Sequence, residues 1–198
     1  NLANYLSEIR NERVLLIDLD PQANATVVST DPAKYKVHTQ TKKTVADVFI
    51  DALRTYGPIR TPPPKALDID DFIYEVYKAP KAKGKFDLIP SELMLSSVLK
   101  GMTLGPYDLE KLISEHVKSK YDYIFIDCAP TNSSLTTVAL NTAPTVLIPM
   151  ISDSFGSHGT ELMKQVLAEH SHDYGINPKV IGVVFTMWDG QVNQVTES

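Results

Sequence analysis

Four short, mostly apolar segments constrain the fold of this chain more than any other feature. They lie at residues 14–19, 121–130, 145–150 and 179–188, and they are rich in branched and aromatic side chains. Continuous apolar runs of this length are typical of strands that are buried on both faces, as in a parallel sheet. We therefore expect these segments to form the strands of such a sheet.

Amphipathic patterns with helical spacing lie before and between these segments. Apolar residues fall on one helical face in residues 2–9, 107–118 and 157–170. Strands that alternate with helices of this length imply right-handed crossovers. The predicted fold class is α/β, with a mostly parallel central sheet that helices cover on both faces.

Length and composition are consistent with one folded domain. The chain has 198 residues, of which 43% are hydrophobic and 22% are charged, so a sizeable core is possible. We expect residues 1–198 to form a single domain, with the proline-rich, non-periodic stretch 54–71 as a surface insertion. We also expect this domain to be incomplete at both ends, because a helix without a capping residue opens the sequence and the sequence stops soon after the last strand.

Composition also limits the cellular compartments and the binding partners that are possible for this protein. No segment approaches the roughly 18 apolar residues that span a bilayer, and residues 1–13 lack the apolar centre of a secretory signal. One cysteine, Cys128, permits no internal disulfide, as is usual in a reducing compartment. We expect a cytoplasmic protein that binds no membrane.

The net charge of -5 does not favour binding of nucleic acid by the protein as a whole, so DNA binding requires an oligomer or a local patch. The lysine-rich residues 78–85 form such a patch or a solvated loop.

Three aspartates follow two of the predicted strands at the point where each strand ends. Asp18 and Asp20 follow the first strand, and Asp127 follows the apolar residues of the second. The carboxyl ends of parallel strands meet at one edge of a sheet, where ligands of open α/β sheets bind. A carboxylate there is costly unless it is hydrogen-bonded or faces a cation. We expect a magnesium ion or a positioned water, with the alternative that each aspartate only caps the following loop or helix.

The stretch VLLIDLDPQANAT, residues 14–26, resembles the segment that follows the phosphate loop in ParA-type partition ATPases, a deviant Walker A family of P-loop NTPases. Four further blocks match in the same order. KTVADVF resembles the short helix that follows the family's first variable loop, and FDLIPSEL resembles its central strand. The run from YDYIFID to TVLIPM resembles its Walker B strand and following unit, and GVVFTMWD resembles its late strand leading to the base-binding loop. The resemblance spans nearly the whole chain and is interrupted at residues 54–71.

This resemblance implies an enzyme that hydrolyses ATP with Mg²⁺ and segregates a plasmid or chromosome. An ATP-bound homodimer is expected to bind DNA without sequence preference, and a ParB-like centromere-binding protein is the expected partner. Asp20 would be the catalytic residue that holds or polarises the attacking water. Asp18 would support the metal and the phosphate-loop side of the nucleotide, and Asp127 would bind Mg²⁺ through water.

Three further residues receive roles by the same resemblance. Pro21 and Gln22 begin a loop that is expected to respond to the γ-phosphate, and Asp189 lies where relatives place an amide or acid near the nucleotide base. The alternative for each of them is a turn residue without contact to the nucleotide.

The family's glycine-rich phosphate loop with its two lysines is not present in the sequence. The Gly84–Lys85 pair does not replace it, because Ala79 and Phe86 stand where that loop requires a glycine and a serine or threonine. Either the loop precedes residue 1 or the protein is a degenerate member of the family. We expect residues 1–198 alone to bind ATP poorly, because several charge-assisted hydrogen bonds are missing.

Two other functions are considered. One is a non-catalytic interaction domain that has lost its nucleotide site. The other is a phosphatase of the haloacid dehalogenase type, because DLDPQ after an apolar strand resembles the D-x-D nucleophile motif. That family has threonine or valine at the position of Gln22, which argues against this alternative.

Overall fold

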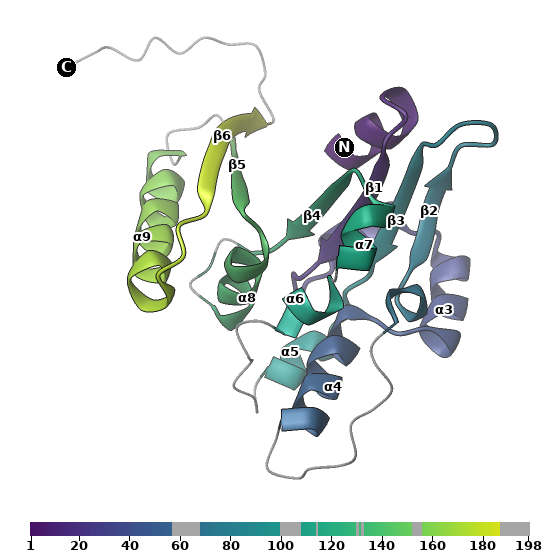
Figure 1. Cartoon of the computed structure of the whole chain (residues 1–198), viewed down its shortest axis with the longest axis horizontal. Helices are drawn as coiled ribbons and strands as arrows, with labels where there is room; N and C mark the ends of the chain where they lie inside the picture. The colour runs from purple at the N-terminus through teal and green to yellow at the C-terminus, as the bar shows by residue number, and fades with distance from the viewer. Residues whose placement is uncertain are drawn as a thin grey trace. The chain divides into compact units, whose positions relative to one another are not determined.

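The computed structural model describes residues 1–56, 68–99, 108–113, 115–129, 131, 133–151 and 156–186. The chain forms two compact units, Asn1–Thr142 and Ala143–Ser198. Figure 1 shows the helices and strands of both. Each unit is described by itself, and the single domain expected from the sequence stays a prediction. No helix in the described ranges is both long and apolar enough to span a bilayer.

The first unit is built on a four-stranded sheet with the order β2-β3-β1-β4. Strand β1 (Arg13–Asp18) runs parallel to β3 (Lys85–Ile89) on one side and to β4 (Tyr123–Asp127) on the other. Strand β2 (Tyr74–Lys78) pairs antiparallel with β3 at the edge. The mostly parallel sheet expected from the sequence is therefore confirmed, whereas its antiparallel edge strand was not anticipated.

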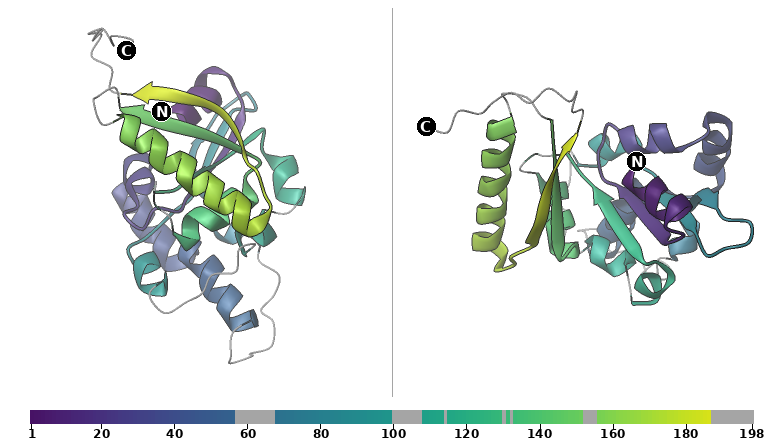
Figure 2. Two further views of the ribbon diagram at one scale, coloured as in Figure 1. Left: turned by 90° about the vertical axis from the view of Figure 1, so that its left-hand side faces the viewer. Right: turned by 90° about the horizontal axis from the view of Figure 1, so that it is seen from above.

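Helices cover both faces of this sheet. Leu15 and Ile17 of β1 are fully buried in a large apolar cluster on one face. Five helices contribute to that cluster: α4 (Val45–Tyr56), α5 (Met94–Leu99), α6 (Asp108–Leu112), α7 (Glu115–Lys120) and α8 (Ser134–Thr142). Val14 faces the other side, where Ala3 and Leu6 pack against it. Figure 2 shows the N-terminal helical segment that carries these two residues beside β1. The alternation of side chains along a buried strand explains why both faces need a covering layer.

The structure adjusts three boundaries. The helix expected at 2–9 is α1 (Leu2–Asn4) continued by the π-helical turn η1 (Tyr5–Ile9). The helix expected at 107–118 is described as the separate helices α6 and α7, although its predicted apolar face is buried as expected. The range 54–71 is too wide for an insertion, because α4 continues to Tyr56 and Ile69 of η2 (Ile69–Asp71) is buried in the core. Residues 57–67 lie outside the described residues.

The second unit contains two parallel strands, β5 (Thr145–Ile151) and β6 (Lys179–Thr186). Helix α9 (Gly156–Tyr174) lies between them in the chain. The predictions for residues 145–150 and 157–170 are thus confirmed as a strand and a helix. The strand expected at 179–188 is confirmed as far as Thr186, where the described residues end.

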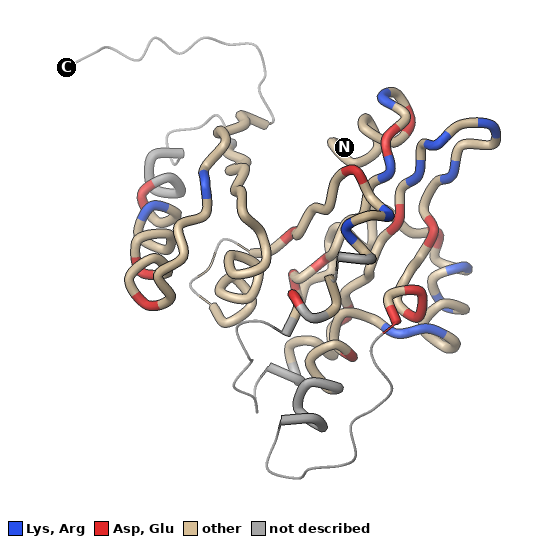
Figure 3. The backbone as a smooth tube through the Cα atoms, in the orientation of Figure 1, with Lys and Arg blue, Asp and Glu red and all other residues tan. Residues whose placement is uncertain are grey.

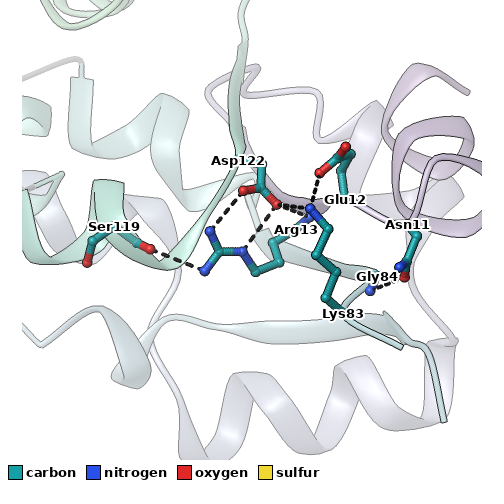
Figure 4. Close-up of polar contacts among 7 residues, drawn as sticks. All are labelled: Asn11, Glu12, Arg13, Lys83, Gly84, Ser119 and Asp122. Atoms are coloured by element: carbon teal, nitrogen blue, oxygen red, sulfur yellow. Dashed lines mark hydrogen bonds and ion pairs between the residues drawn. The ribbon is translucent and has the colours of Figure 1, made fainter. Parts of the chain in front are cut away.

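An ionic cluster ties three segments together at the amino end of the first sheet (Figure 4). The Arg13 guanidinium donates to both carboxylate oxygens of Asp122 and to the carbonyl oxygen of Ser119. Lys83, in the turn between β2 and β3, pairs with Glu12 at 2.7 Å and with Asp122 at 3.6 Å. The cluster therefore joins the β2–β3 hairpin to the start of β1 and to the residues that precede β4.

Candidate functional site

The candidate site lies at the carboxyl edge of the four-stranded sheet, where β1 and β4 end side by side. Asp18 and Asp127 are paired residues in the register of these strands, and the N–H of Leu19 donates to the carbonyl oxygen of Asp127 at 2.7 Å. The two strand ends that the sequence predicts to meet are thus neighbours. Their side chains leave the sheet on the same face, because directly opposed residues of parallel strands do so.

Asp18 is fully buried, and its carboxylate accepts hydrogen bonds from Asp20 and Thr26, which follow β1 in the chain. Its Oδ2 accepts hydrogen bonds from the backbone N–H and the hydroxyl of Thr26, at 2.8 and 2.7 Å, and its Oδ1 accepts from the N–H of Asp20 at 3.0 Å. Burial raises the pKa of Asp18, and these hydrogen bonds partly offset the rise. The contacts support the structural alternative for this residue, because they hold the loop and the start of α2 (Asn24–Ser29) against the strand end.

Asp20 occupies the turn between β1 and α2 and is only half buried. Its Oδ1 accepts from the N–H of Gln22 at 2.9 Å, and its carbonyl oxygen accepts from the N–H of Ala23 at 2.8 Å. Its Oδ2 has no hydrogen-bond partner among the residues that the structure describes. The turn ends at Ala23, whose φ of +53° lies in the left-handed region that alanine rarely adopts. One carboxylate oxygen of Asp20 is thus held in place and the other is available.

Pro21 and Gln22 form the middle of this turn. Pro21 is half buried and Gln22 is exposed. The turn role that we considered for both residues is therefore observed, and their response to a γ-phosphate stays a prediction. Asp189 lies outside the described residues.

Asp127 is exposed, and its carboxylate has no hydrogen-bond partner in the described ranges. Its pKa is raised first by the protein atoms that partly desolvate it and then by the negative charges of Asp18 and Asp20. A cation would relieve this repulsion, so the arrangement fits a divalent ion. The described residues contain no group of three acidic, histidine or cysteine side chains that could hold a metal. Among divalent ions, Mg²⁺ typically binds one or two carboxylates and keeps several waters, so the available carboxylate of Asp127 fits this ion.

Ser91 is a member of this site that the sequence analysis missed. It follows the carboxyl end of β3, and its hydroxyl donates to the carbonyl oxygen of Asp20 at 2.8 Å. Its N–H donates to the Thr26 hydroxyl at 2.9 Å. A polar residue two positions after a strand of the same sheet was the available signal, because the strand within FDLIPSEL ends at the same edge.

The Gly84–Lys85 pair is not a phosphate-binding loop in the structure either. It lies at the amino end of β3, and the N–H of Gly84 donates to Asn11 Oδ1 at 2.6 Å. The Lys85 ammonium is 2.6 Å from Oδ2 of the buried Asp87. Of the lysines in residues 78–85, Lys83 and Lys85 are engaged within the protein, and Figure 3 shows the basic residues around this hairpin. The described residues thus offer carboxylates for Mg²⁺ but no cradle for a triphosphate.

Comparison with known proteins gives consistent matches over most of the chain. A family model described as an AAA domain matches residues 1–180. The chain is 28% identical over 198 residues to the sporulation initiation inhibitor protein Soj of Bacillus subtilis. This match covers 98% of this chain and 67% of that protein. It is 26% identical to the chromosome-partitioning ATPase Soj of Treponema pallidum, over 100% of this chain and 68% of that protein.

A solved structure of a plasmid partition protein from Borrelia burgdorferi superposes on this chain with a TM-score of 0.72. The two are 22% identical, and the match covers 98% of this chain and 74% of the other. This likeness shows the fold. The chain spans about two thirds of the length of the two Soj proteins that it matches.

Proposed function

Because the chain belongs to the ParA-type family of partition ATPases, we propose that the protein hydrolyses ATP with Mg²⁺ at the carboxyl edge of its four-stranded sheet. The observation that carries this proposal is the pairing of Asp18 with Asp127, with Asp20 beside them. Asp127 and Asp20 each have carboxylate oxygen available for a ligand, whereas Asp18 is occupied in holding the loop.

The division of labour follows from these environments. Asp20, the proposed catalytic residue, orients the attacking water through its available Oδ2, while its Oδ1 is fixed by the N–H of Gln22. Asp127 would hold Mg²⁺ through water, and the ion would supply positive charge that neutralises the phosphates. Phosphoryl transfer depends chiefly on such positioning and charge neutralisation. Asp18 contributes by fixing the path of the chain that carries Asp20.

The wider role that we propose is DNA partition. An ATP-bound homodimer binds DNA without sequence preference, and a ParB-like protein stimulates hydrolysis. The chromosome-partitioning and plasmid-partition names of the relatives support this role. Such an activity belongs in the cytoplasm, where DNA and ATP are both available.

The structure argues against the phosphatase alternative. In the D-x-D motif the first aspartate is the nucleophile, and this position is Asp18. Asp18 is fully buried, and both of its oxygens accept hydrogen bonds from Thr26 or Asp20. A nucleophile needs an approach path for phosphorus, which this carboxylate lacks.

Steady-state release of phosphate from ATP, measured on the protein as its gene encodes it, tests the proposal. We expect turnover that requires Mg²⁺ and is abolished by EDTA. Absence of both ATP binding and turnover would favour the non-catalytic interaction domain. An acid-stable, hydroxylamine-sensitive aspartyl phosphate would favour the phosphatase instead.

A further inference from the structure

The segment that follows β3 holds three other parts of the chain in place. The N–H of Val45, at the start of α4, donates to the carbonyl oxygen of Pro90 at 2.9 Å. The hydroxyl of Tyr35, on α3 (Pro32–Thr41), donates to the carbonyl oxygen of Ser91 at 2.8 Å. The hydroxyl of Ser91 in turn donates to the Asp20 carbonyl, as described above. The segment Pro90–Ser91 is therefore held in place by hydrogen bonds to other parts of the chain, and the loop that carries Asp20 is anchored to it.

We infer that Ser91 is a positioning residue for Asp20 and that it acts on the rate of ATP hydrolysis rather than on nucleotide affinity. This inference rests on the proposed function and names a determinant of the same site. Ser91 has no exposed surface, so it does not itself touch a nucleotide. We infer that it affects the reaction indirectly, because its hydroxyl fixes the carbonyl group of Asp20.

The geometry of the turn explains why the hydrogen bond from Ser91 matters for the position of Asp20. The Asp20 carbonyl is bound from within the turn by the N–H of Ala23 and from outside it by the Ser91 hydroxyl. The first bond closes the turn, and the second joins this carbonyl to the segment that follows β3. Asp18 fixes the Asp20 N–H on the other side of the residue. Loss of the serine hydroxyl leaves one side of Asp20 unanchored, and displacement of a catalytic group by about 1 Å can cost up to 10²-fold in rate.

Two variants, each of which deletes one hydroxyl that forms a hydrogen bond in this segment, separate positioning from simple packing. Ser91→Ala removes the hydrogen bond to Asp20. Tyr35→Phe removes the hydrogen bond to the carbonyl of the same Ser91 and leaves the Asp20 contact intact. We expect Ser91→Ala to lower kcat about tenfold with KM for ATP within about twofold of the parent value. Tyr35→Phe should leave kcat within about twofold, although it also loses a hydrogen bond.

A double-mutant cycle then shows whether Ser91 acts through Asp20. If it does, Ser91→Ala causes no further loss of kcat in an Asp20→Ala background, because the positioned group is already gone. The protein as encoded by its gene is used throughout. Ser91→Cys, which puts a somewhat larger and only weakly donating thiol in place of the hydroxyl, replaces Ser91→Ala if that variant does not fold, and the same loss is expected.

The outcomes separate this inference from the proposed function. Parental kcat in Ser91→Ala, or the same tenfold loss in the Asp20→Ala background, overturns the positioning role alone. Unchanged turnover in Asp20→Ala overturns the proposed catalytic role, and the positioning role falls with it.

Discussion

Asp18 and Asp127 are register partners at the ends of adjacent parallel strands, yet their carboxylates have opposite environments. Asp18 is fully buried and accepts three hydrogen bonds from Asp20 and Thr26, which follow it in the chain. Asp127 is exposed and has no such partner in the described part of the chain. Asp18 and Asp127 thus lie at the same edge of the sheet, but Asp127 is the one whose carboxylate is available to a ligand.

Replacement of Asp20 tests the proposed catalytic residue. We expect Asp20→Ala to lower kcat for ATP hydrolysis by about 10² or more with little change in ATP affinity, because a water-positioning group acts mainly in the transition state. Phosphate release and calorimetric ATP titration measure the two quantities. Glu110→Ala, which removes an exposed carboxylate from α6, should leave both unchanged. Equal turnover in Asp20→Ala and the parent protein would contradict the assignment.

Replacement of Asp127 tests the proposed metal ligand. Asp127→Asn keeps the size of the side chain and removes its charge, so we expect the Mg²⁺ concentration for half-maximal turnover to rise about tenfold or more. Excess Mg²⁺ should restore part of the rate. Glu75→Gln on β2 is the matched control, since it removes one exposed carboxylate charge away from the site. A Mg²⁺ titration curve that coincides with that of the parent would refute the role.

DNA binding provides a third prediction. If the ATP-bound dimer is the binding form, affinity for a DNA fragment of arbitrary sequence appears only with ATP and Mg²⁺. Contacts to phosphates release counterions, so affinity should fall about tenfold or more between about 50 and 200 mM salt. Fluorescence anisotropy with labelled duplexes of two unrelated sequences measures both effects. Salt-insensitive binding, or binding by the nucleotide-free monomer, is the opposing result.

Gly84 is required by a close approach of the N-terminal turn. A Cβ at this position would overlap the carbonyl oxygen of Ser7 and would lie 2.8 Å from Asn11 Oδ1. We expect Gly84→Ala to lower the free energy of unfolding by about 1–3 kcal/mol, as overpacking usually does. Gly182→Ala is the control, because the nearest atom to its Cβ is Leu147 Cδ1 at an ordinary 3.8 Å. Urea denaturation should place the midpoint of Gly84→Ala alone clearly below that of the parent.

The Arg13–Asp122 pair predicts a pH dependence of stability. Hydrogen bonds from Arg13 hold the pKa of Asp122 well below its ordinary value. A carboxyl with a lowered pKa stabilises the folded state above its unfolded pKa of about 4, and this contribution is lost as the pH falls below that value. Asp122→Asn should therefore cost about 1 kcal/mol at pH 7 and progressively less from about pH 4 to pH 2. Urea denaturation at each pH gives the difference, which should be near zero throughout for Glu8→Gln.

The sequence was sufficient to predict the parallel strands and the edge at which the acids meet. Apolar runs such as Leu15–Ile17 are unambiguous because both faces of the strand are buried, and the acid that ends each run is visible in the sequence. Strand β2 was not predicted, because the YEVYK segment mixes charged and aromatic residues and is defined by its pairing with β3. The sequence also could not show that Asp18 holds the loop while Asp127 is available to a metal ion, because metal binding and loop capping both favour aspartate.

The role of Ser91 was not predictable for a different reason. Its partners, Tyr35, Thr26 and Asp20, are 56, 65 and 71 residues away in the chain. No local pattern in residues 86–93 indicates which carbonyl or hydroxyl will lie opposite the serine once the strands have paired.

That separation along the chain has a consequence for how the protein folds. The hydrogen bond between Ser91 and Asp20 closes a loop of 71 residues, and closing it requires β3 to have found its place beside β1. Contacts between distant residues form slowly, because chain entropy is lost before they are made. We therefore expect this turn to take its final form only after β3 has paired with β1, and in a chain emerging from the ribosome not before residue 91 has been synthesised.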